Sequence, residues 1–86
     1  MATEEKVGVV TGYYSKINVA AVKLTDGALR VGDRIRIHGH TTDFTQPVDS
    51  LQIEHQAVDH AEQGSELALK VRERVRLHDQ IFRVQD

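Results

Sequence analysis

The sequence predicts an all-β fold, a small six-stranded antiparallel barrel of Greek-key-like topology. The β-branched residues valine and isoleucine together clearly outnumber leucine, and such side chains favour strands over helices. Apolar and polar residues alternate along short runs, and turns containing glycine or aspartate separate these runs. Closing the strands into a barrel would remove the exposed edges that an open sheet of this size carries.

The first strand is expected over residues 6–14, with Val7, Val9 and Thr11 on one face. The second is expected over residues 17–24, which are fairly apolar on both faces, as in a central strand. The third covers residues 33–38, where isoleucines alternate with outward polar side chains. The last three strands are marked by apolar residues, namely Val48, Leu51 and Ile53, then Leu67, Leu69 and Val71, and finally Ile81, Phe82 and Val84.

Two stretches between these strands are harder to assign. Residues 55–64 place Ala57, Val58 and Ala61 at helical spacing, but ten residues ending in glycine favour a structured loop. Residues 39–46 are expected to form an exposed polar loop, and Pro47 to open the next strand, where its missing N–H does no harm.

Two segments, residues 29–35 and 75–81, share the pattern apolar-Arg-apolar-X-Asp-polar-Ile. Position X requires a left-handed or bridging backbone, which Gly32 adopts without steric cost and His78 tolerates better than most residues would. An Asp-Gly pair after the second strand predicts a hairpin turn, because it supplies positive φ angles. The residues assigned to turns are Asp26, Gly27, Gly32, Asp33, Gly64, His78 and Asp79.

The 86 residues are expected to form one domain over residues 6–86, after a short polar tail over residues 1–5. The absence of cysteine excludes disulfides and thiolate metal sites. No apolar run approaches the roughly 18 residues of a membrane span, so we expect a cytoplasmic protein without membrane contacts. The formal charge of −2 argues against a general nucleic-acid binder, which usually has a pI above about 9, so any RNA contact must come from a local patch.

The stretch INVAAVKLTDGALRVGDRIRIHG resembles the second-domain β-barrel of translational GTPases such as elongation factor Tu, and PVDSLQIEH, AEQGSELALKV and HDQIF continue the likeness over residues 7–84. The chain also resembles small stand-alone translation elongation factor-like proteins. It is similar as well to the C-terminal barrel of some collagenase-like peptidases, a family with members linked to RNA modification. The resemblance implies a barrel that contacts RNA or a protein partner. His78 departs from the glycine that is usual in the family turn, and no pocket residues carry over.

A metal site is one interpretation of the polar stretch after the third strand. His38 and His40 would share a strand face, and Asp43 lies nearby. Zinc requires three or four ligands, and nothing fixes His55, Asp59 or His60 near this group, so an exposed loop is the favoured interpretation. We therefore expect no metal and no cofactor.

No catalytic motif stands out. The P-loop pattern is absent, since GVVTG lacks its glycine spacing and lysine, so nucleotide hydrolysis is not expected. Gly8 and Gly12 are explained instead by crowding in a tightly curved strand. The serines lie in no G-x-S-x-G elbow, and no carboxylate pair suggests acid–base chemistry. We expect a protein without enzymatic activity.

Alternating cations give the main functional hypothesis, which is contact with the phosphates of tRNA or rRNA. The third strand projects three of them, and four more recur at every second position later in the chain, provided that this stretch stays extended. A solvated barrel exterior explains the same pattern. Tyr13, Tyr14 and Phe44 could stack bases. Tyr13 and Tyr14 are adjacent, so on a strand one would face the core and the other the surface, and an ordinary core ring and surface ring are the simpler interpretation. The candidate RNA-binding residues are Arg34, Arg36, His38, Lys70, Arg72, Arg74 and Arg76.

The rival hypothesis is a protein-interaction module that docks on a partner enzyme, such as a collagenase-like peptidase or an RNA-modifying protein. The similar barrels appended to longer chains motivate it. The sequence does not decide between an RNA and a protein partner.

Overall fold

The computed structural model describes residues 3–85, which contain ten strands and no helix. The strands are β1 (Thr3–Tyr14), β2 (Val19–Lys23), β3 (Leu29–Arg30), β4 (Arg34–His38), β5 (Asp43–Pro47), β6 (Leu51–Ile53), β7 (Gln56–Val58), β8 (His60–Ala61), β9 (Glu66–Lys70) and β10 (Gln80–Gln85). Eight of them form one antiparallel sheet in the order β5-β4-β10-β1-β2-β9-β6-β7, and β3 pairs with β8 separately.

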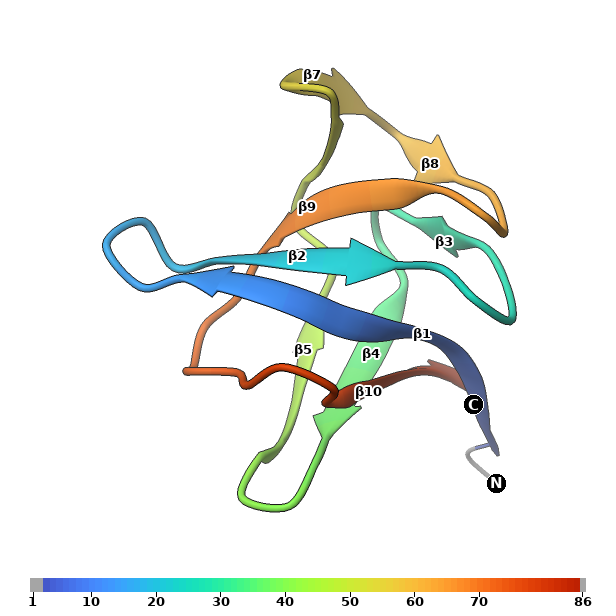
Figure 1. Ribbon diagram of the computed structural model, residues 1–86. Helices are drawn as coiled ribbons and strands as arrows, with labels where there is room; N and C mark the ends of the chain where they lie inside the picture. Colours follow the sequence, from blue (N-terminus) through green and yellow to red (C-terminus); the bar gives the residue numbers. More distant parts are fainter. Residues whose placement is uncertain (1–2, 86) are drawn as a thin grey trace.

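The predicted all-β class is confirmed, and the six predicted strands correspond to β1, β2, β4, β6, β9 and β10. The strand pairing does not reproduce a closed six-stranded barrel. The order of the large sheet is open, and within residues 3–85 its two end strands, β5 and β7, form no ladder with each other. Figure 1 shows how the sheet curls, so that β4 and β5 lie behind β1 and β2.

Buried apolar side chains from both layers of this curled sheet form a single core. They come from the inward positions of the main strands and from the connections between them. The buried residues are Val7, Val10, Ala20, Val22, Leu24, Leu29, Ile35, Ile37, Val48, Leu51, Ala61, Leu67, Leu69, Val71, Val75 and Ile81. At roughly 25 cal/mol per Å² of apolar surface, this burial is the main favourable contribution to folding.

A side chain, rather than a strand ladder, bridges β5 to the end of β9. Gln46 is only 1% exposed. Its Nε2 donates to the carbonyl oxygen of Lys70 at 2.9 Å, and its Oε1 accepts from the backbone N–H of Arg72 at 2.8 Å. An amide suits this position because it offers a donor and an acceptor at once. Gln46 therefore satisfies backbone groups in the gap that a closing strand would otherwise fill.

Two bulges in β1 change which of its residues face the core. The register shifts against β10 after Lys6 and against β2 after Val10. An extra residue reverses the in-and-out alternation, so Val7 and Val10 are both fully buried, whereas Val9 is half-buried and Thr11 is exposed. The predicted common face of Val7, Val9 and Thr11 is therefore wrong.

Gly8 lies where β1 passes very close to the end of β2. A Cβ at this position would lie 2.5 Å from the carbonyl oxygen of Lys23 and 3.3 Å from the Cα of Leu24, so a side chain would collide with backbone. At Gly12 the nearest atom would be the Cβ of Ala21 at 3.5 Å, an ordinary contact. Crowding thus explains the first glycine of GVVTG but not the second.

The two segments with the shared pattern fold into the same turn. In each, the aspartate Oδ2 accepts from the backbone N–H three residues earlier, at 2.9 Å for Asp33 and 2.8 Å for Asp79. The residue before the aspartate has a positive φ, 98° at Gly32 and 73° at His78. Such a φ at the third residue of a four-residue turn is typical of a type II turn.

The hairpin expected at Asp26 and Gly27 is absent from this position. Neither residue has a positive φ, and β2 pairs with β1 and β9 rather than with β3. The N–H of Asp26 donates instead to the carbonyl of Val7 at 3.1 Å as the chain leaves the large sheet. Gly64 does adopt a positive φ, 95°, and its N–H donates to the carbonyl of Leu24 at 2.7 Å.

Three further predictions about local structure need correction. Part of the expected polar tail is strand, because residues 3–5 pair with β10, while residues 1–2 lie outside the described range. The expected loop over residues 39–46 contains most of β5. The expected loop over residues 55–64 contains β7 and β8, and it begins with a tight turn in which Glu54 and His55 both have positive φ.

Among residues 3–85 no helical segment has the length and apolarity that crossing a lipid bilayer would require. The cytoplasmic location stays a prediction.

Candidate docking surface

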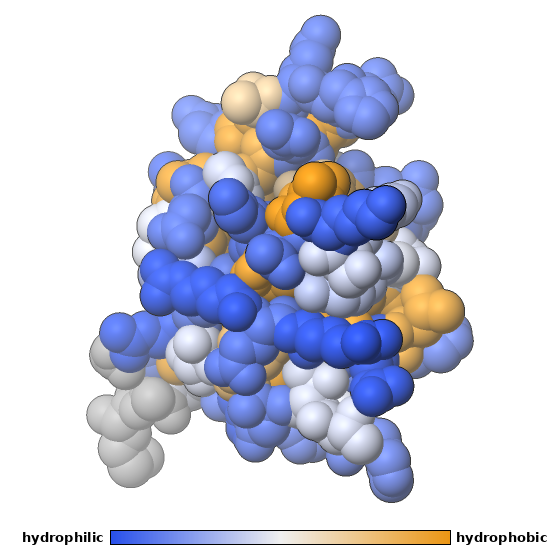
Figure 2. Space-filling model, turned by 90° about the vertical axis from the view of Figure 1, so that its left-hand side faces the viewer, coloured by the Kyte–Doolittle hydropathy of each residue, from blue (hydrophilic) through white to orange (hydrophobic). Residues whose placement is uncertain are grey.

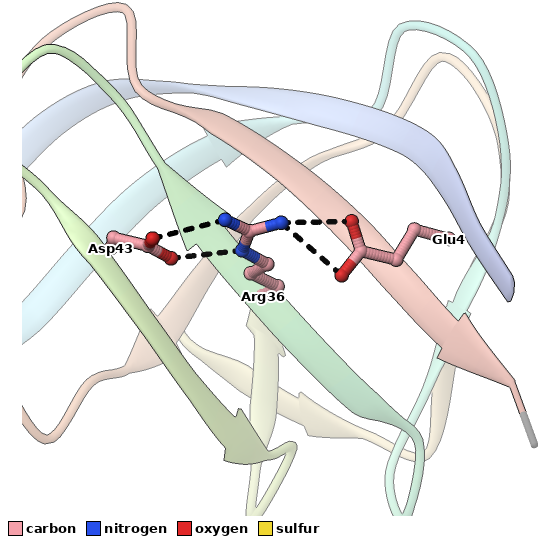
Figure 3. Close-up of polar contacts among 3 residues, drawn as sticks. All are labelled: Glu4, Arg36 and Asp43. Carbon is pink, nitrogen blue, oxygen red and sulfur yellow. Dashed lines mark hydrogen bonds and ion pairs between the residues drawn. The ribbon is translucent and has the colours of Figure 1, made fainter. Parts of the chain in front are cut away.

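The first group of predicted RNA-binding residues lies on β4, and its central residue, Arg36, is hydrogen-bonded to two carboxylates. Arg34 and His38 are exposed. Arg36 donates through Nε and Nη2 to the two carboxylate oxygens of Asp43, at 2.8 and 2.9 Å, and through Nη1 to Glu4 at 3.1 Å. Figure 3 shows the guanidinium between these two carboxylates. Its charge is therefore compensated within the protein.

This arrangement shifts the pKa of both main partners. The hydrogen bonds from Arg36 hold the pKa of the Asp43 carboxyl below its ordinary value, and the two carboxylates raise the pKa of the Arg36 guanidinium. Charge-assisted bonds with two parallel N–H donors are among the stronger polar contacts in proteins. They join β5 and β4 to the beginning of β1, on the outer side of the sheet.

The second group, from Lys70 to Arg76, does not form the straight row of cations that a strand would give. β9 ends at Lys70, and residues 71–79 cross to β10 without strand structure. In this crossing segment Val71, Val75 and Asp79 are buried at every fourth position, and the arginines between them point outward. Arg72 pairs with Asp49 at 3.3 Å. RNA binding by either group stays a prediction.

The possible metal site does not assemble in the described part of the chain. No three His, Cys, Asp or Glu side chains among residues 3–85 come together as a metal-binding group. His38 lies opposite Asp43 in the β4–β5 ladder, but the Asp43 carboxylate is held by Arg36. His40 is exposed in the connection between these strands.

The aromatic residues divide into core and surface rings. Tyr13 and Phe44 are half-buried and pack against the core. The Tyr13 hydroxyl donates to the side chain of Asn18 at 3.4 Å. Tyr14 is 58% exposed. Only Tyr14 among the three thus presents most of its ring to an outside partner.

Large exposed hydrophobic residues gather at one end of the molecule. Four such residues are exposed in the described range, and three of them, Tyr14, Ile17 and Leu77, surround the β1–β2 hairpin. We call these three the hairpin surface. Figure 2 views the side of the molecule at which this hairpin projects, and hydrophobic residues are visible there among hydrophilic ones. Grouped exposed apolar residues mark interaction sites, whereas single ones are ordinary.

Two shallow depressions flank Tyr14. The first, of about 690 Å³, is bounded by residues 11–14 of β1 and by residues 74–77, so Tyr14 and Leu77 share it. The second, of about 550 Å³, crosses the outer face of β2, β9 and β6, and Tyr14 and Ile17 share it. The surface is recessed here because two small side chains, Ala21 and Ala68, lie opposite each other in the β2–β9 ladder. The hairpin surface thus offers apolar side chains beside hollows that a partner could fill.

Sequence reasoning pointed to Tyr14 but missed Ile17 and Leu77. The alternation over residues 17–24 predicts Ile17 inside the second strand, whereas it lies in the hairpin turn and is 61% exposed. The pattern of residues 75–81 predicts Leu77 only as an apolar turn position, and it is 58% exposed. The signal that could have found both is an isolated large apolar residue within a turn whose neighbour is a cation, Lys16 or Arg76.

The chain is similar in sequence to peptidases. It is 36% identical over 85 residues to a collagenase of Porphyromonas gingivalis, a match that covers 95% of this chain and 20% of the collagenase. It is 35% identical over 78 residues to an uncharacterized protease of Methanocaldococcus jannaschii, covering 90% of this chain and 19% of that protease. The chain thus spans about a fifth of the length of the curated relatives that it matches. No protein-family model matches it.

Two solved structures share the fold. Both are of the C-terminal domain of a Geobacillus thermoleovorans protein named as a U32 peptidase. One, a selenomethionine variant, gives a TM-score of 0.84 at 24% identity, over 90% of this chain and 96% of that one. The other gives 0.85 at 23% identity, over 92% and 91%. At these identities the likeness establishes the fold alone.

These comparisons correct the assignment to translation elongation factor-like proteins. Similarity along nearly the whole chain is to collagenases and a protease, and the shared fold is that of a U32 peptidase C-terminal domain. The assignment to translation factors is therefore wrong, and these relatives do not support a role in translation or RNA metabolism. The likeness to collagenase-like peptidases, expected beside it, agrees with them. The chain is similar in sequence to about a fifth of the length of a collagenase and a protease, and in fold to the C-terminal domain of a U32 peptidase.

Proposed function

We propose that this chain is a non-catalytic interaction domain that docks on a U32-type peptidase polypeptide through the hairpin surface. The single observation that carries the proposal is the grouping of Tyr14, Ile17 and Leu77 around one hairpin, beside two depressions. The peptidase relatives supply the class of partner, since in them the similar stretch is joined to about four times its own length of other sequence.

The chemistry of the hairpin surface suits a protein partner. Tyrosine is enriched at the centres of protein interfaces, where it contributes a large apolar area and a hydroxyl. Small alanines beside it allow a partner side chain to approach the sheet closely. A stable interface buries about 800 Å² on each partner, so the hairpin surface would form its centre and the surrounding polar residues its rim.

Binding to a truncated peptidase tests this proposal. The probe is the Porphyromonas gingivalis collagenase without the stretch that matches this chain, checked for folding by circular dichroism and titrated with this chain in a calorimeter. We expect saturable one-to-one binding. Replacing Tyr14 by Ala and Ile17 by Asp should weaken it by about tenfold or more, because truncating a central anchor costs about 1–4 kcal/mol.

The two similar turns provide a matched control. Leu77 and Val31 occupy the same position in turns of the same geometry, and Val31 is the fourth exposed large hydrophobic residue, at 43%. It lines neither depression beside Tyr14. Leu77→Asp should weaken binding strongly and Val31→Asp little. Equal effects of the two substitutions, or no binding to a folded truncated peptidase, would refute the proposal.

A further inference from the structure

The depression between β1 and residues 74–77 is cationic as well as apolar. Arg74 and Arg76 line it and are exposed, and none of the ion pairs within residues 3–85 includes either of them. Arg36 and Arg72, by contrast, are paired with carboxylates. Two positive charges without an ion-pair partner in the described range therefore lie beside Tyr14 and Leu77, in a chain whose formal net charge is −2.

The same depression exposes an edge of β1. The ladder with β10 ends at Val9. Val10 then exchanges two backbone hydrogen bonds with the crossing segment, donating to Asp79 at 2.8 Å and accepting from His78 at 2.9 Å. Beyond Val10, β2 is the only strand among the described residues that pairs with β1, and residues 11–14 border the depression on their other side.

The backbone groups of Tyr13 point toward this open edge. The N–H of Leu24 and the carbonyl of Asn18, at the two ends of β2, both bond on the β9 side, at 2.9 and 2.8 Å. Alternate residues of a regular strand point the same way, so Ala20 also bonds toward β9. Tyr13 lies opposite Ala20, and its N–H and C=O therefore point away from β2. Within residues 3–85 no backbone hydrogen bond is recorded to them across this edge.

We infer that this depression binds an extended, acidic segment of polypeptide. An extended segment adds to an exposed strand edge through main-chain hydrogen bonds, and the adjoining pockets select its side chains. Here Tyr13 provides one donor and one acceptor, Arg74 and Arg76 provide charge-assisted bonds to carboxylates, and Tyr14 and Leu77 flank an apolar side chain. The inference rests on the proposed docking function and assigns the chemistry of the docked segment.

Fluorescence anisotropy with two synthetic peptides tests this without the peptidase. One labelled peptide alternates glutamate with valine, and the other alternates lysine with valine. At low ionic strength the acidic peptide should bind the wild-type chain and the basic peptide should not. Arg74→Glu/Arg76→Glu should weaken acidic-peptide binding by about tenfold or more, because the substitutions place like charges opposite each other.

The control is Arg30→Glu/Arg34→Glu, which changes the net charge equally on exposed residues that do not line this depression. Arg30 also occupies the same turn position as Arg76. This control should bind the acidic peptide as the wild type does. Failure of the acidic peptide to bind, equal losses in the two charge-reversed variants, or stronger binding of a single-stranded oligouridylate at the same arginines would overturn the inference. None of these results depends on the titration with the truncated collagenase.

Discussion

His78 has a backbone conformation in which a side chain is costly. Its φ of 73° matches the turn position that glycine occupies in the equivalent segment, at Gly32. A non-glycine residue in the left-handed region destabilises the folded state by roughly 1–2 kcal/mol, because its Cβ lies too close to the backbone. The repeated pattern around Asp33 and Asp79 made this turn predictable from the sequence. The side-chain bond of each aspartate to the backbone explains how histidine is held there.

Replacing His78 by Gly should stabilise the protein. Relief of the left-handed strain outweighs the greater freedom of glycine in the unfolded chain, so we expect the free energy of unfolding to rise by about 0.5–1 kcal/mol. Urea denaturation followed by circular dichroism measures the change. The converse substitution, Gly32→Ala, should destabilise the matching turn by a similar amount. A His78→Gly variant less stable than the wild type would contradict this account of the turn.

Asp43 predicts a dependence of stability on pH. Arg36 lowers the pKa of this carboxyl in the folded state below its ordinary value of 3.8. The ionised form therefore stabilises the fold above pH 3.8, and this contribution is lost as the pH falls through the lower folded pKa. The free energies of unfolding of the wild type and of Asp43→Asn should differ at neutral pH and converge in strong acid. A difference that stays constant between neutral pH and pH of about 2 would contradict this role.

Strands in which apolar and polar residues alternate could be predicted from the sequence, whereas β5 could not. Its inward positions are Phe44 and Gln46, so a polar residue interrupts the pattern that identified β4 and β9. The short strands β7 and β8 lack a buried run, and their positions depend on partners far along the chain. The bulges of β1 depend likewise on both neighbouring strands.

Gln46→Leu tests whether this side chain holds the curled sheet together. The substitution leaves the carbonyl of Lys70 and the N–H of Arg72 without their present partner. A fully buried group left unpaired costs about 1–3 kcal/mol, and because these two groups are only partly buried and the leucine adds apolar burial, the free energy of unfolding should fall by about 1–3 kcal/mol in total. The neighbouring exposed Thr45, replaced by Ala, should change it far less. A loss no larger than that of the control would show that the bridge is dispensable.

At the scale of the whole molecule, the sequence predicted the fold class and left the partner open. Period-two hydrophobicity specifies strands, and the turn motifs occur in any barrel that uses such turns, so they did not separate translation factors from peptidases. The turn sequences mark Ile17 and Leu77 one by one, but their grouping with Tyr14 could not be predicted, because it arises only after β1, β2 and the crossing segment have packed. The ion pairs of Arg36 and Arg72 could not be predicted either. Their partners Glu4, Asp43 and Asp49 come close to them only in the folded chain.

The calorimetric titration of this chain into the truncated collagenase tests the docking account most directly, with the Tyr14→Ala/Ile17→Asp variant run beside the wild type. The account predicts heat of one-to-one binding for the wild type and, for the variant, affinity reduced by about tenfold or more at unchanged fold. Equal affinities for wild type and variant would contradict it, because docking would then use another face of the molecule.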